Sequence, residues 1–259
     1  MTKEIPQNIM NLSKIAILAA QKSAKKILKS KKTISYKYIN NTNPSSSLDL
    51  IIEDTIISVI KKMRPDDGII GEEGGVINSK NGVRWIIDPI DGTMNYLHNI
   101  PHWCISIACE KLINEQWTTI VGVVYDVLKN EFFSAIQGYG AKINNNKLFV
   151  LKTKSLQKAL IATEFSYNIA TRLEQISMIS NLVNVVKDIR STGSSALDIC
   201  WIALGRFDGF FESDLSYWDW AASSLILREA GGTVSPFQQG IVASNTLIHK
   251  QLIKRISLK

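Results

Sequence analysis

The sequence has few of the residues that disulfide-stabilised, zinc-binding or membrane-spanning proteins require. Only three of its 259 residues are cysteines and three are histidines, and neither set has the spacing of a zinc site. An odd cysteine count argues against a disulfide framework, so we expect a reducing, cytoplasmic compartment. No apolar run reaches the roughly 18 residues that a membrane span needs, and residues 1–7 lack the apolar core of a signal peptide.

The positive charge is concentrated at one end of the chain. The formal net charge is +7, and residues 1–40 contain nine lysines against a single acid, Glu4. Residues 8–30 have helical periodicity, and four lysines share the polar face of this helix: Lys22, Lys25, Lys26 and Lys29. A basic face of this kind is more often simply solvated than a binding site. Contact with RNA or with an acidic partner stays open as the alternative.

The hydrophobic pattern predicts a mixed α/β chain folded as a single domain over residues 1–259. A hydrophobic content of 45% is enough for a sizeable core. Helical periodicity is found at residues 8–30, 47–63, 171–187, 195–204 and 217–230. Strands are predicted at residues 69–71, 83–88, 102–109, 118–127, 131–135, 159–164, 189–192 and 207–212. Residues 31–47 are polar and predict a loop.

The most informative stretch is residues 83–95, Val-Arg-Trp-Ile-Ile-Asp-Pro-Ile-Asp-Gly-Thr-Met-Asn. Its apolar run predicts a buried strand that ends at Asp88, because Pro89 has no N–H to give to a sheet. Asp91 follows three residues later, so both carboxylates can converge. Gly92 and Thr93 then favour the start of a helix, with Thr93 as its N-cap. Carboxylates bind Mg²⁺ and a helix N-terminus binds phosphate, although an Asp-rich turn is the simpler reading.

Other acids lie at similar junctions of strands and helices. Glu72 follows a short apolar strand, Asp49 lies near the start of a predicted helix, and Asp219 begins another helix between two tryptophans. Residues 193–195, Gly-Ser-Ser, join a strand to a helix and form a second candidate site for an anion or a hydroxyl. Ordinary turns and helix caps would account for each of these features taken singly.

Taken together, the motifs resemble those of the inositol monophosphatase family and are most similar to its bacterial SuhB-type members. The matching segments are Gly71-Glu72-Glu73, the run from Trp85 to Asn95, Tyr217-Trp218-Asp219 and Ala230-Gly231-Gly232. The resemblance implies a layered α-β-α-β-α sandwich of the inositol monophosphatase/fructose-bisphosphatase type. It also implies a homodimer, a metal- and phosphate-binding half at roughly residues 1–150 and a substrate-binding half at residues 151–259.

The resemblance further implies two to three Mg²⁺ ions held by oxygen ligands. One ion would be bound by Glu72, Asp88 and the main-chain carbonyl of Ile90, and a second by Asp88, Asp91 and Asp219. A third, weaker ion would use Glu72 and water. The residues themselves agree with this, because all the side chains are carboxylates and no cysteine or histidine site competes.

The implied reaction is hydrolysis of a phosphate monoester by metal-activated water, with sensitivity to lithium. Thr93 and Asp49 match the pair thought to help activate the water in the family, and we count Glu72 with them as catalytic. The N–H groups of Gly92 and Thr93 would bind a phosphate oxygen. The hydroxyls of the leaving group would face the remaining family-like positions, which are Asp91, Gly193, Ser194, Ser195 and Glu212.

The substrate expected from this set is inositol monophosphate or a similar polyol phosphate. Histidinol phosphate, a sugar bisphosphate and a 3′-phosphonucleotide are alternatives, because the phosphate-binding end would be shared. A regulatory protein that binds RNA or the transcription machinery is an alternative of a different class, and the basic first helix is compatible with it.

Overall fold

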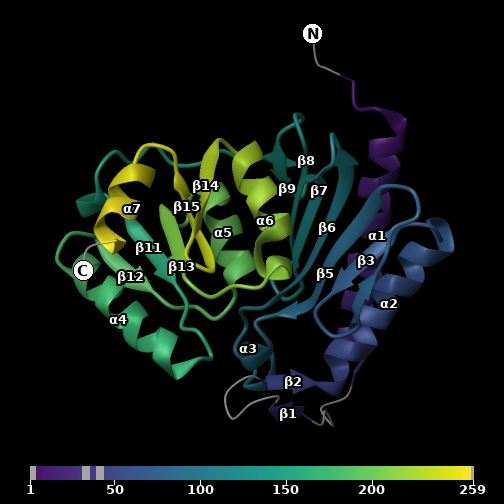
Figure 1. Cartoon of the computed structure of the whole chain (residues 1–259), viewed down its shortest axis with the longest axis horizontal. Helices are drawn as coiled ribbons and strands as arrows, with labels where there is room; N and C mark the ends of the chain where they lie inside the picture. Colours follow the sequence, from purple (N-terminus) through teal and green to yellow (C-terminus); the bar gives the residue numbers. More distant parts are fainter. Residues whose placement is uncertain (1–3, 31–35, 39–43, 258–259) are drawn as a thin grey trace.

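A computed structural model describes residues 4–30, 36–38 and 44–257. These residues form seven α-helices and two large β-sheets (Figure 1). The helices are α1 (Gln7–Lys29), α2 (Ser47–Met63), α3 (Thr93–Leu97), α4 (Ile169–Val183), α5 (Ser195–Leu204), α6 (Tyr217–Glu229) and α7 (His249–Ile256). A single 3₁₀ turn, η1 (Leu156–Lys158), precedes the second sheet.

The first sheet has eight strands in the order β10-β9-β8-β7-β6-β5-β3-β4. Their bounds are β3 (Gly68–Gly71), β4 (Gly75–Ile77), β5 (Val83–Asp91), β6 (Cys104–Ile113), β7 (Gln116–Asp126), β8 (Glu131–Ile136), β9 (Ala141–Ile143) and β10 (Asn146–Lys147). Only β3 and β5 pair in parallel; the other neighbours are antiparallel. The parallel pair places the carboxyl ends of β3 and β5 side by side.

The second sheet has five strands in the order β12-β11-β13-β15-β14. Their bounds are β11 (Leu160–Thr163), β12 (Asp188–Arg190), β13 (Gly209–Glu212), β14 (Gly232–Phe237) and β15 (Gly240–Asn245). Strand β11 is parallel to both of its neighbours, so the carboxyl ends of β11, β12 and β13 lie at one edge. That edge faces the same cavity as the carboxyl end of β5.

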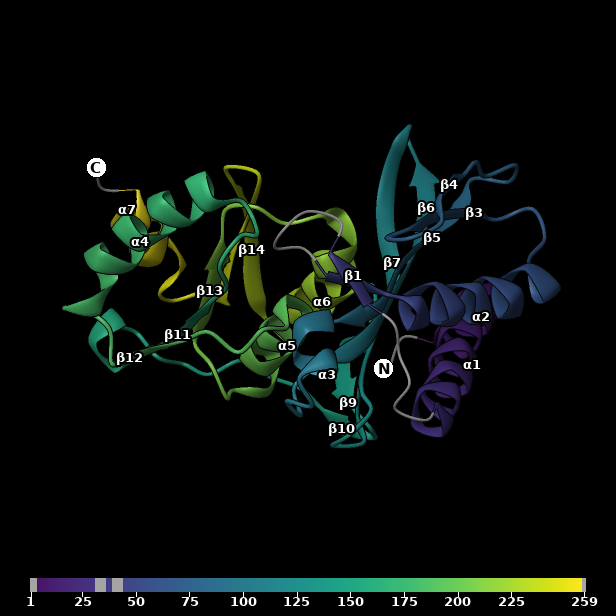
Figure 2. The same cartoon turned by 90° about the horizontal axis from the view of Figure 1, so that it is seen from below.

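The elements stack in five layers, as the resemblance implied (Figures 1 and 2). Helices α1 and α2 cover one face of the first sheet, and α5 and α6 fill the space between the two sheets. Helices α4 and α7 cover the outer face of the second sheet. Three groups of buried apolar side chains lie under α1 and α2, around α5 and α6 between the two sheets, and under α4 and α7. The hydrophobic effect therefore accounts for the order of the layers.

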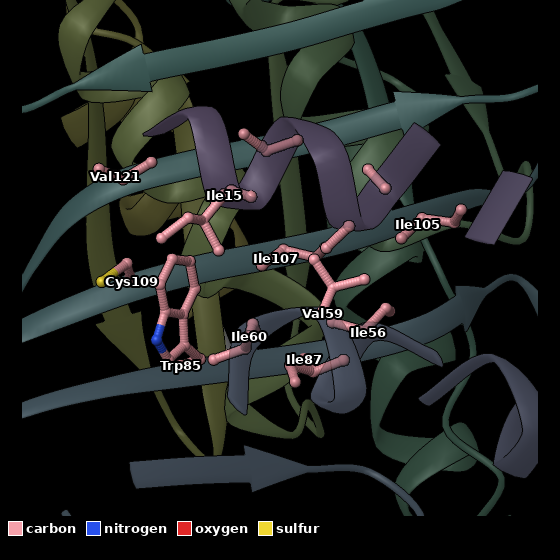
Figure 3. Close-up of a cluster of buried hydrophobic side chains, with 14 of the residues drawn as sticks. Ile15, Ile56, Val59, Ile60, Trp85, Ile87, Ile105, Ile107, Cys109 and Val121 are labelled. Atoms are coloured by element: carbon pink, nitrogen blue, oxygen red, sulfur yellow. The ribbon is translucent and has the colours of Figure 1, made fainter. Parts of the chain in front are cut away.

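The interface under α1 and α2 contains the largest buried side chain, Trp85 on β5 (Figure 3). Its ring packs with Ile15 of α1 and Ile60 of α2, and its indole N–H donates to the buried carboxylate of Asp67 over 2.9 Å. Burying an aromatic ring of this size is worth several kcal/mol. The packing fixes β5, which carries the central motif, against two helices.

Helix α6 lies unusually close to the first sheet because β7 has a glycine where they cross. A Cβ atom built on Gly122 would lie 2.5 Å from the carbonyl oxygen of Ala222, a distance that no side chain can occupy. The close approach brings the N-terminus of α6, and with it Asp219, toward the end of β5.

Most of the elements predicted from the sequence are confirmed, with three corrections. Strand β5 runs on to Asp91, with a shift of register between Asp88 and Asp91, instead of ending at Asp88. The N-cap of α3 is Gly92, in the left-handed conformation (φ +96°), and not Thr93, which is its first residue. The predicted loop at residues 31–47 contains a short hairpin of β1 (Tyr36–Tyr38) and β2 (Pro44–Ser46). Residues 31–35 and 39–43 of that loop lie outside the described residues.

Cys104 and Cys109, five residues apart on β6, point into different core interfaces, as alternation along a strand requires. Among the described helices, none is long and apolar enough to cross a membrane.

Candidate active site

A cavity of about 860 Å³ opens where the carboxyl ends of strands from both sheets meet the first residues of α3 and α6. Of the predicted site residues, it brings together Glu72, Asp88, Ile90, Asp91, Gly92, Thr93, Gly193, Ser195, Glu212 and Asp219. Asp49 and Ser194 are not part of its wall. The cavity therefore unites residues that lie more than 140 positions apart in the chain.

The bulge at the end of β5 places Asp88 and Asp91 in different surroundings. Asp88 is 2% exposed, and its Oδ1 atom has no hydrogen-bond partner among the described residues. Burial, together with the negative charges of Glu72 and Asp91, raises the pKa of Asp88 well above its usual range. An unpartnered carboxylate oxygen in so buried a position is energetically unfavourable, and a cation would satisfy it.

Asp91 is tied to the opposite half of the molecule. Its Oδ2 atom accepts hydrogen bonds from the main-chain N–H of Ala196, over 2.9 Å, and from the hydroxyl of Ser194. The thiol of Cys104 also lies 3.6 Å from this atom. Burial raises the pKa of Asp91 to about 6, although the bonds from Ser194 and Ala196 lower it. Asp91 thus joins the end of β5 to the start of α5.

Glu72 is held by main-chain contacts at the end of β3. Its N–H donates to the carbonyl of Ile87 on β5. The next two N–H groups, those of Glu73 and Gly74, donate to the buried carboxylate of Glu53 on α2. The Glu72 side chain is exposed to solvent in the cavity, and desolvation by nearby protein atoms, together with the charges of Asp219 and Asp49, raises its pKa well above the usual range. Glu53 was not predicted as a site residue, yet it fixes the turn that carries Glu72.

Asp219 closes the acidic group from the side of the second sheet. It is the third residue of α6 and accepts a hydrogen bond from the Ser216 N–H over 2.8 Å, in a capping box. One carboxylate oxygen is therefore used by the cap, and the other is available to the cavity. Burial and the charge of Asp91 raise the pKa of Asp219 to about 8. Asp219 can therefore cap α6 with one oxygen and offer the other to a metal ion.

The cavity wall is strongly and uniformly acidic. It contains eight carboxyl groups and, among the described residues, no Lys, Arg or His; the eight are Glu72, Glu73, Asp88, Asp91, Glu164, Glu212, Asp214 and Asp219. Within the described part of the chain, no three carboxylate, imidazole or thiol groups are already drawn together into a metal-binding cluster. The donor set nevertheless fits a hard divalent cation, because its donors are oxygens and Asp88 presents an unsatisfied one.

At the start of α3, the predicted catalytic pair is close but not tightly hydrogen-bonded. The Thr93 hydroxyl lies 3.0 Å from the carbonyl oxygen of Ile90 and 3.5 Å from Oδ1 of Asp49. A hydroxyl has one hydrogen to donate, and the shorter distance assigns it to Ile90. Asp49 is 1% exposed and lies behind Thr93.

The strand–helix junction at residues 193–195 is pressed against α3. Gly193 has a left-handed backbone (φ +90°), and a Cβ atom on it would lie 2.5 Å from Nδ2 of Asn95. That same Nδ2 donates to the carbonyls of His102 and Thr192, over 2.7 and 2.6 Å. Only glycine fits at this point, so Asn95 sets how closely the junction approaches the site.

The two serines after Gly193 have different surroundings. The Ser194 side chain is 1% exposed and its hydroxyl donates to Asp91, so it does not open into the cavity. The Ser195 hydroxyl does line the cavity and donates to Oε2 of Glu212 over 3.0 Å. Burial and the charges of Glu164 and Asp219 raise the pKa of Glu212.

Several residues that line the cavity were not predicted from the sequence. The segment after β11 contributes Glu164, Phe165, Ser166, Tyr167, Asn168 and Ile169, and the segment after β13 contributes Asp214, Leu215 and Ser216. Ligands often bind beyond the carboxyl ends of parallel strands, and this rule points to the residues after β11 once the strand order is known. The sequence alone does not give the strand order.

The fold and the acidic cavity define a class of layered α/β protein with an oxygen-rich site, and the comparisons identify the family. A model of the inositol monophosphatase family matches residues 7–256. The chain therefore belongs to the inositol monophosphatase family, whose members are generally metal-dependent.

Several relatives match this chain over nearly their whole length. The chain is similar to the Nus factor SuhB of Pasteurella multocida, with 40% identity over 93% of this chain and 94% of the relative. It is similar to the crystal structure of the extragenic suppressor protein suhB from Bartonella henselae (TM-score 0.89, 30% identity, 95% and 98% coverage). It is also similar to the inositol monophosphatase from Anabaena (TM-score 0.82, 31% identity, 96% coverage of both chains).

The crowded carboxyl groups predict how stability depends on pH in the absence of divalent metal. Asp91 and Asp219 bind their protons more tightly in the folded protein, with pKa values of about 6 and about 8, than at the ordinary value of 3.8. The free energy of unfolding should therefore fall as pH rises from about 4 to about 8. Urea denaturation in EDTA at several pH values measures this slope.

Removing one of the charges should flatten the slope. We expect Asp88→Asn to lessen the loss of stability toward pH 8, because the buried carboxylate that it removes faces Glu72 and Asp91. Asp66→Asn, at an exposed position outside the cavity, is the matched control and should behave like the wild type. A stability that rises with pH in EDTA would contradict the electrostatic account of this cavity.

Proposed function

We propose that the protein is a Mg²⁺-dependent phosphomonoesterase that hydrolyses inositol monophosphate or a similar polyol phosphate. The observation that carries the proposal is the unpartnered oxygen of Asp88 in a cavity of eight carboxyl groups. A polyanionic substrate can enter such a cavity only with cations, and this matches a family whose members are generally metal-dependent.

The residues that would hold the ions are Glu72, Asp88, the Ile90 carbonyl, Asp91 and Asp219. When bound, divalent cations in such a site neutralise phosphate charge and lower the pKa of water at the site. The contribution of the chain is to hold these oxygens on rigid supports: Glu53 fixes the turn of Glu72, the bulge of β5 carries Asp88 and Asp91, and the α6 cap orients Asp219.

The remaining predicted residues would position the reacting groups. Thr93 and Asp49 lie at the phosphate end, where the Thr93 hydroxyl can turn from Ile90 toward Asp49 and accept a hydrogen bond from a water molecule. Gly92 and Thr93 line the cavity at the start of α3, and their N–H groups would bind a phosphate oxygen. We place most of metal and phosphate binding in roughly residues 1–150, to which Asp219 is added from the second half, and recognition of the leaving group in residues 151–259.

The charge of the cavity favours one substrate class over the others. The leaving-group end, formed by Ser195, Glu212 and Asp214, has acceptors for hydroxyl protons. Among the described residues, it has no basic side chain to pair with a second phosphate. Neutral polyols fit this end, cationic amino alcohols such as histidinol are tolerated by it, and bisphosphates are disfavoured.

The first functional prediction concerns Asp88, which is the proposed ligand of both principal ions. We expect Asp88→Asn to reduce Mg²⁺-dependent release of phosphate from inositol monophosphate by at least about 10³-fold, because the shared ligand loses its charge. Circular dichroism should confirm that the variant is folded. Turnover near that of the wild type would exclude this ligand assignment. Inhibition of the wild type by lithium, which the resemblance implies, can be measured in the same assay.

The second functional prediction concerns the charge of the leaving group. Assayed with Mg²⁺, inositol monophosphate should have a kcat/KM at least about tenfold above that of a sugar bisphosphate or of a 3′-phosphonucleotide with a second phosphate. Histidinol phosphate should lie between them. A preference for the bisphosphates would refute the proposed substrate class while leaving the phosphatase activity intact.

A second candidate function is a regulatory contact with RNA or with the transcription machinery. The names of curated relatives, Nus factor SuhB, favour it. The structure offers one surface to examine, a shallow groove between α1 and α2 lined by Lys22, Lys26 and Lys62 together with Asp54 and Val59. The Lys26 ammonium already donates to the hydroxyl of Thr55, and none of the described residues that line the groove is an aromatic residue that could stack on a base.

The third functional prediction separates these two candidates. We expect the quadruple Lys→Gln variant at Lys22, Lys25, Lys26 and Lys29 to bind RNA no differently from a weakly binding wild type, and to hydrolyse phosphate normally. If the basic face did bind RNA, neutralising it would weaken binding and reduce the salt dependence. Gel-shift titrations at two salt concentrations, run beside the phosphate-release assay, distinguish these outcomes. Tight wild-type binding that the variant loses would support the regulatory function instead.

The cytoplasmic location and the homodimer stay predictions from the sequence. Exposed apolar side chains along α4, among them Ile169 and Leu173 at 66% each, are compatible with a subunit contact. Sedimentation analysis of the purified protein would determine its oligomeric state.

A further inference from the structure

One carboxyl group supports the whole loop that leads into α5. Glu164 follows β11, and its Oε1 atom accepts hydrogen bonds from the N–H groups of Thr192 and Gly193, over 2.6 and 2.7 Å. Its Oε2 atom accepts a third from the Ser191 hydroxyl over 2.7 Å. Residues 191–193 are therefore held by Glu164 on one side and by Asn95 on the other. Gly193, the proposed substrate contact, lies between these two supports.

A second carboxyl group lies against the first. Asp198, in the first turn of α5, is fully buried, and Thr192 bridges it to Glu164, because the Thr192 N–H donates to Glu164 and the Thr192 hydroxyl donates to Asp198. Its Oδ1 atom accepts a hydrogen bond from the Thr192 hydroxyl, but its Oδ2 atom meets no donor among the described residues unless a proton is present. Two ionised carboxylates bridged by one residue are both acceptors and repel each other, and one proton between them would relieve this repulsion and satisfy Oδ2 of Asp198.

The surroundings do not supply a cation in place of that proton. His102 Nε2 lies 3.3 Å from Oδ1 of Asp198 and 2.9 Å from the Thr192 hydroxyl. Burial and the charge of Lys129 lower the pKa of His102, which favours the neutral ring. The other charged groups that act on the pair or on His102 are Asp91, Glu212 and Asp126, all of them acidic. Burial raises the pKa of Glu164 and of Asp198 to about 7 each.

We propose that Glu164 and Asp198 are positioning residues that share one proton, and that this carboxyl pair fixes residues 191–193 beneath the leaving group. The pair acts through the loop and touches no reacting atom. Its effect on substrate affinity rests on the proposed function, whereas its effect on the loop does not. When the shared proton dissociates at alkaline pH, the two carboxylates repel each other and the loop loosens.

Amide substitutions separate the shared proton from the negative charge. In Glu164→Gln, the Oε1 atom can still accept from Thr192 and Gly193, while the amide nitrogen replaces Oε2 and donates permanently to Asp198. The Ser191 hydroxyl, which donates to Oε2 in the wild type, can turn to accept from this amide. In Asp198→Asn, the amide donates to Glu164 in the same way. Glu164→Ala removes the support altogether. Glu174→Gln, at an exposed position on α4, is the control that removes a charge without touching the loop.

The kinetic test compares KM and kcat for inositol monophosphate between about pH 6.5 and 9. We expect Glu164→Ala to raise KM about tenfold with kcat changed less than about threefold, because binding and not the chemical step depends on the loop. The two amide variants should stay within about twofold of the wild-type KM at pH 7. The wild-type KM should rise at least about threefold toward pH 9, and the amide variants should lack this rise, because their bridging hydrogen does not dissociate.

A second measurement does not depend on activity. Hydrogen exchange of the Thr192 and Gly193 amides should accelerate about tenfold or more in Glu164→Ala and stay at the wild-type rate in Glu164→Gln and Glu174→Gln. A wild type without phosphatase activity would refute the proposed function, and exchange would still test the pair. Unchanged exchange in Glu164→Ala would overturn the positioning role. Should that variant fail to fold, Glu164→Gln decides: exchange faster than wild type, or a KM that rises with pH as in the wild type, would overturn the shared proton.

Discussion

The mutual repulsion of carboxyl groups in one cavity is the constraint on which the rest of the structure depends. Eight acids line the cavity, and burial raises the pKa of Asp88, Asp91 and Asp219. Groups that repel one another stay together only when each is fixed by other interactions. The structure meets this requirement with rigid supports: the bulge in β5, the turn held by Glu53, and the capping box of α6.

The apolar packing between the layers explains why those supports are rigid. The Trp85 side chain of β5 is fully buried under α1 and α2. Gly122 allows the backbone of α6 to contact β7 directly. The stabilising contacts are thus apolar and lie outside the cavity, whereas the cavity itself is destabilising without cations. This division is expected of a functional site, where local interactions are suboptimal and the surrounding core compensates for them.

The sequence was most informative where a local pattern and a chemical role coincide. Asp88, Asp91 and Glu72 follow apolar strands, and Asp219 begins a helix, so each could be predicted from its neighbours and from the family motifs. Glu164, Asn95 and Glu53 could not be predicted, because their importance comes from partners 20 to 97 residues away. The N-cap assignment of Thr93 was wrong because Gly92 can take the left-handed conformation that the turn requires. The hairpin of β1 and β2 within residues 31–47 was not predicted, because strands of three residues are too short to show a periodic pattern of apolar residues.

The hydrogen bonds from Ser194 and Ala196 to Asp91 have a consequence for how the protein folds. They join residues 103 and 105 positions apart, and loop closure over such a span is slow compared with the formation of a helix or a hairpin. The first sheet can form early from hairpins of neighbouring strands, but the cavity exists only after the second sheet has docked on α5 and α6. A chain arrested before that docking would present Asp88 and Asp91 to solvent as an ordinary acidic turn. Metal affinity would therefore be a property of the completed protein and of no half of it.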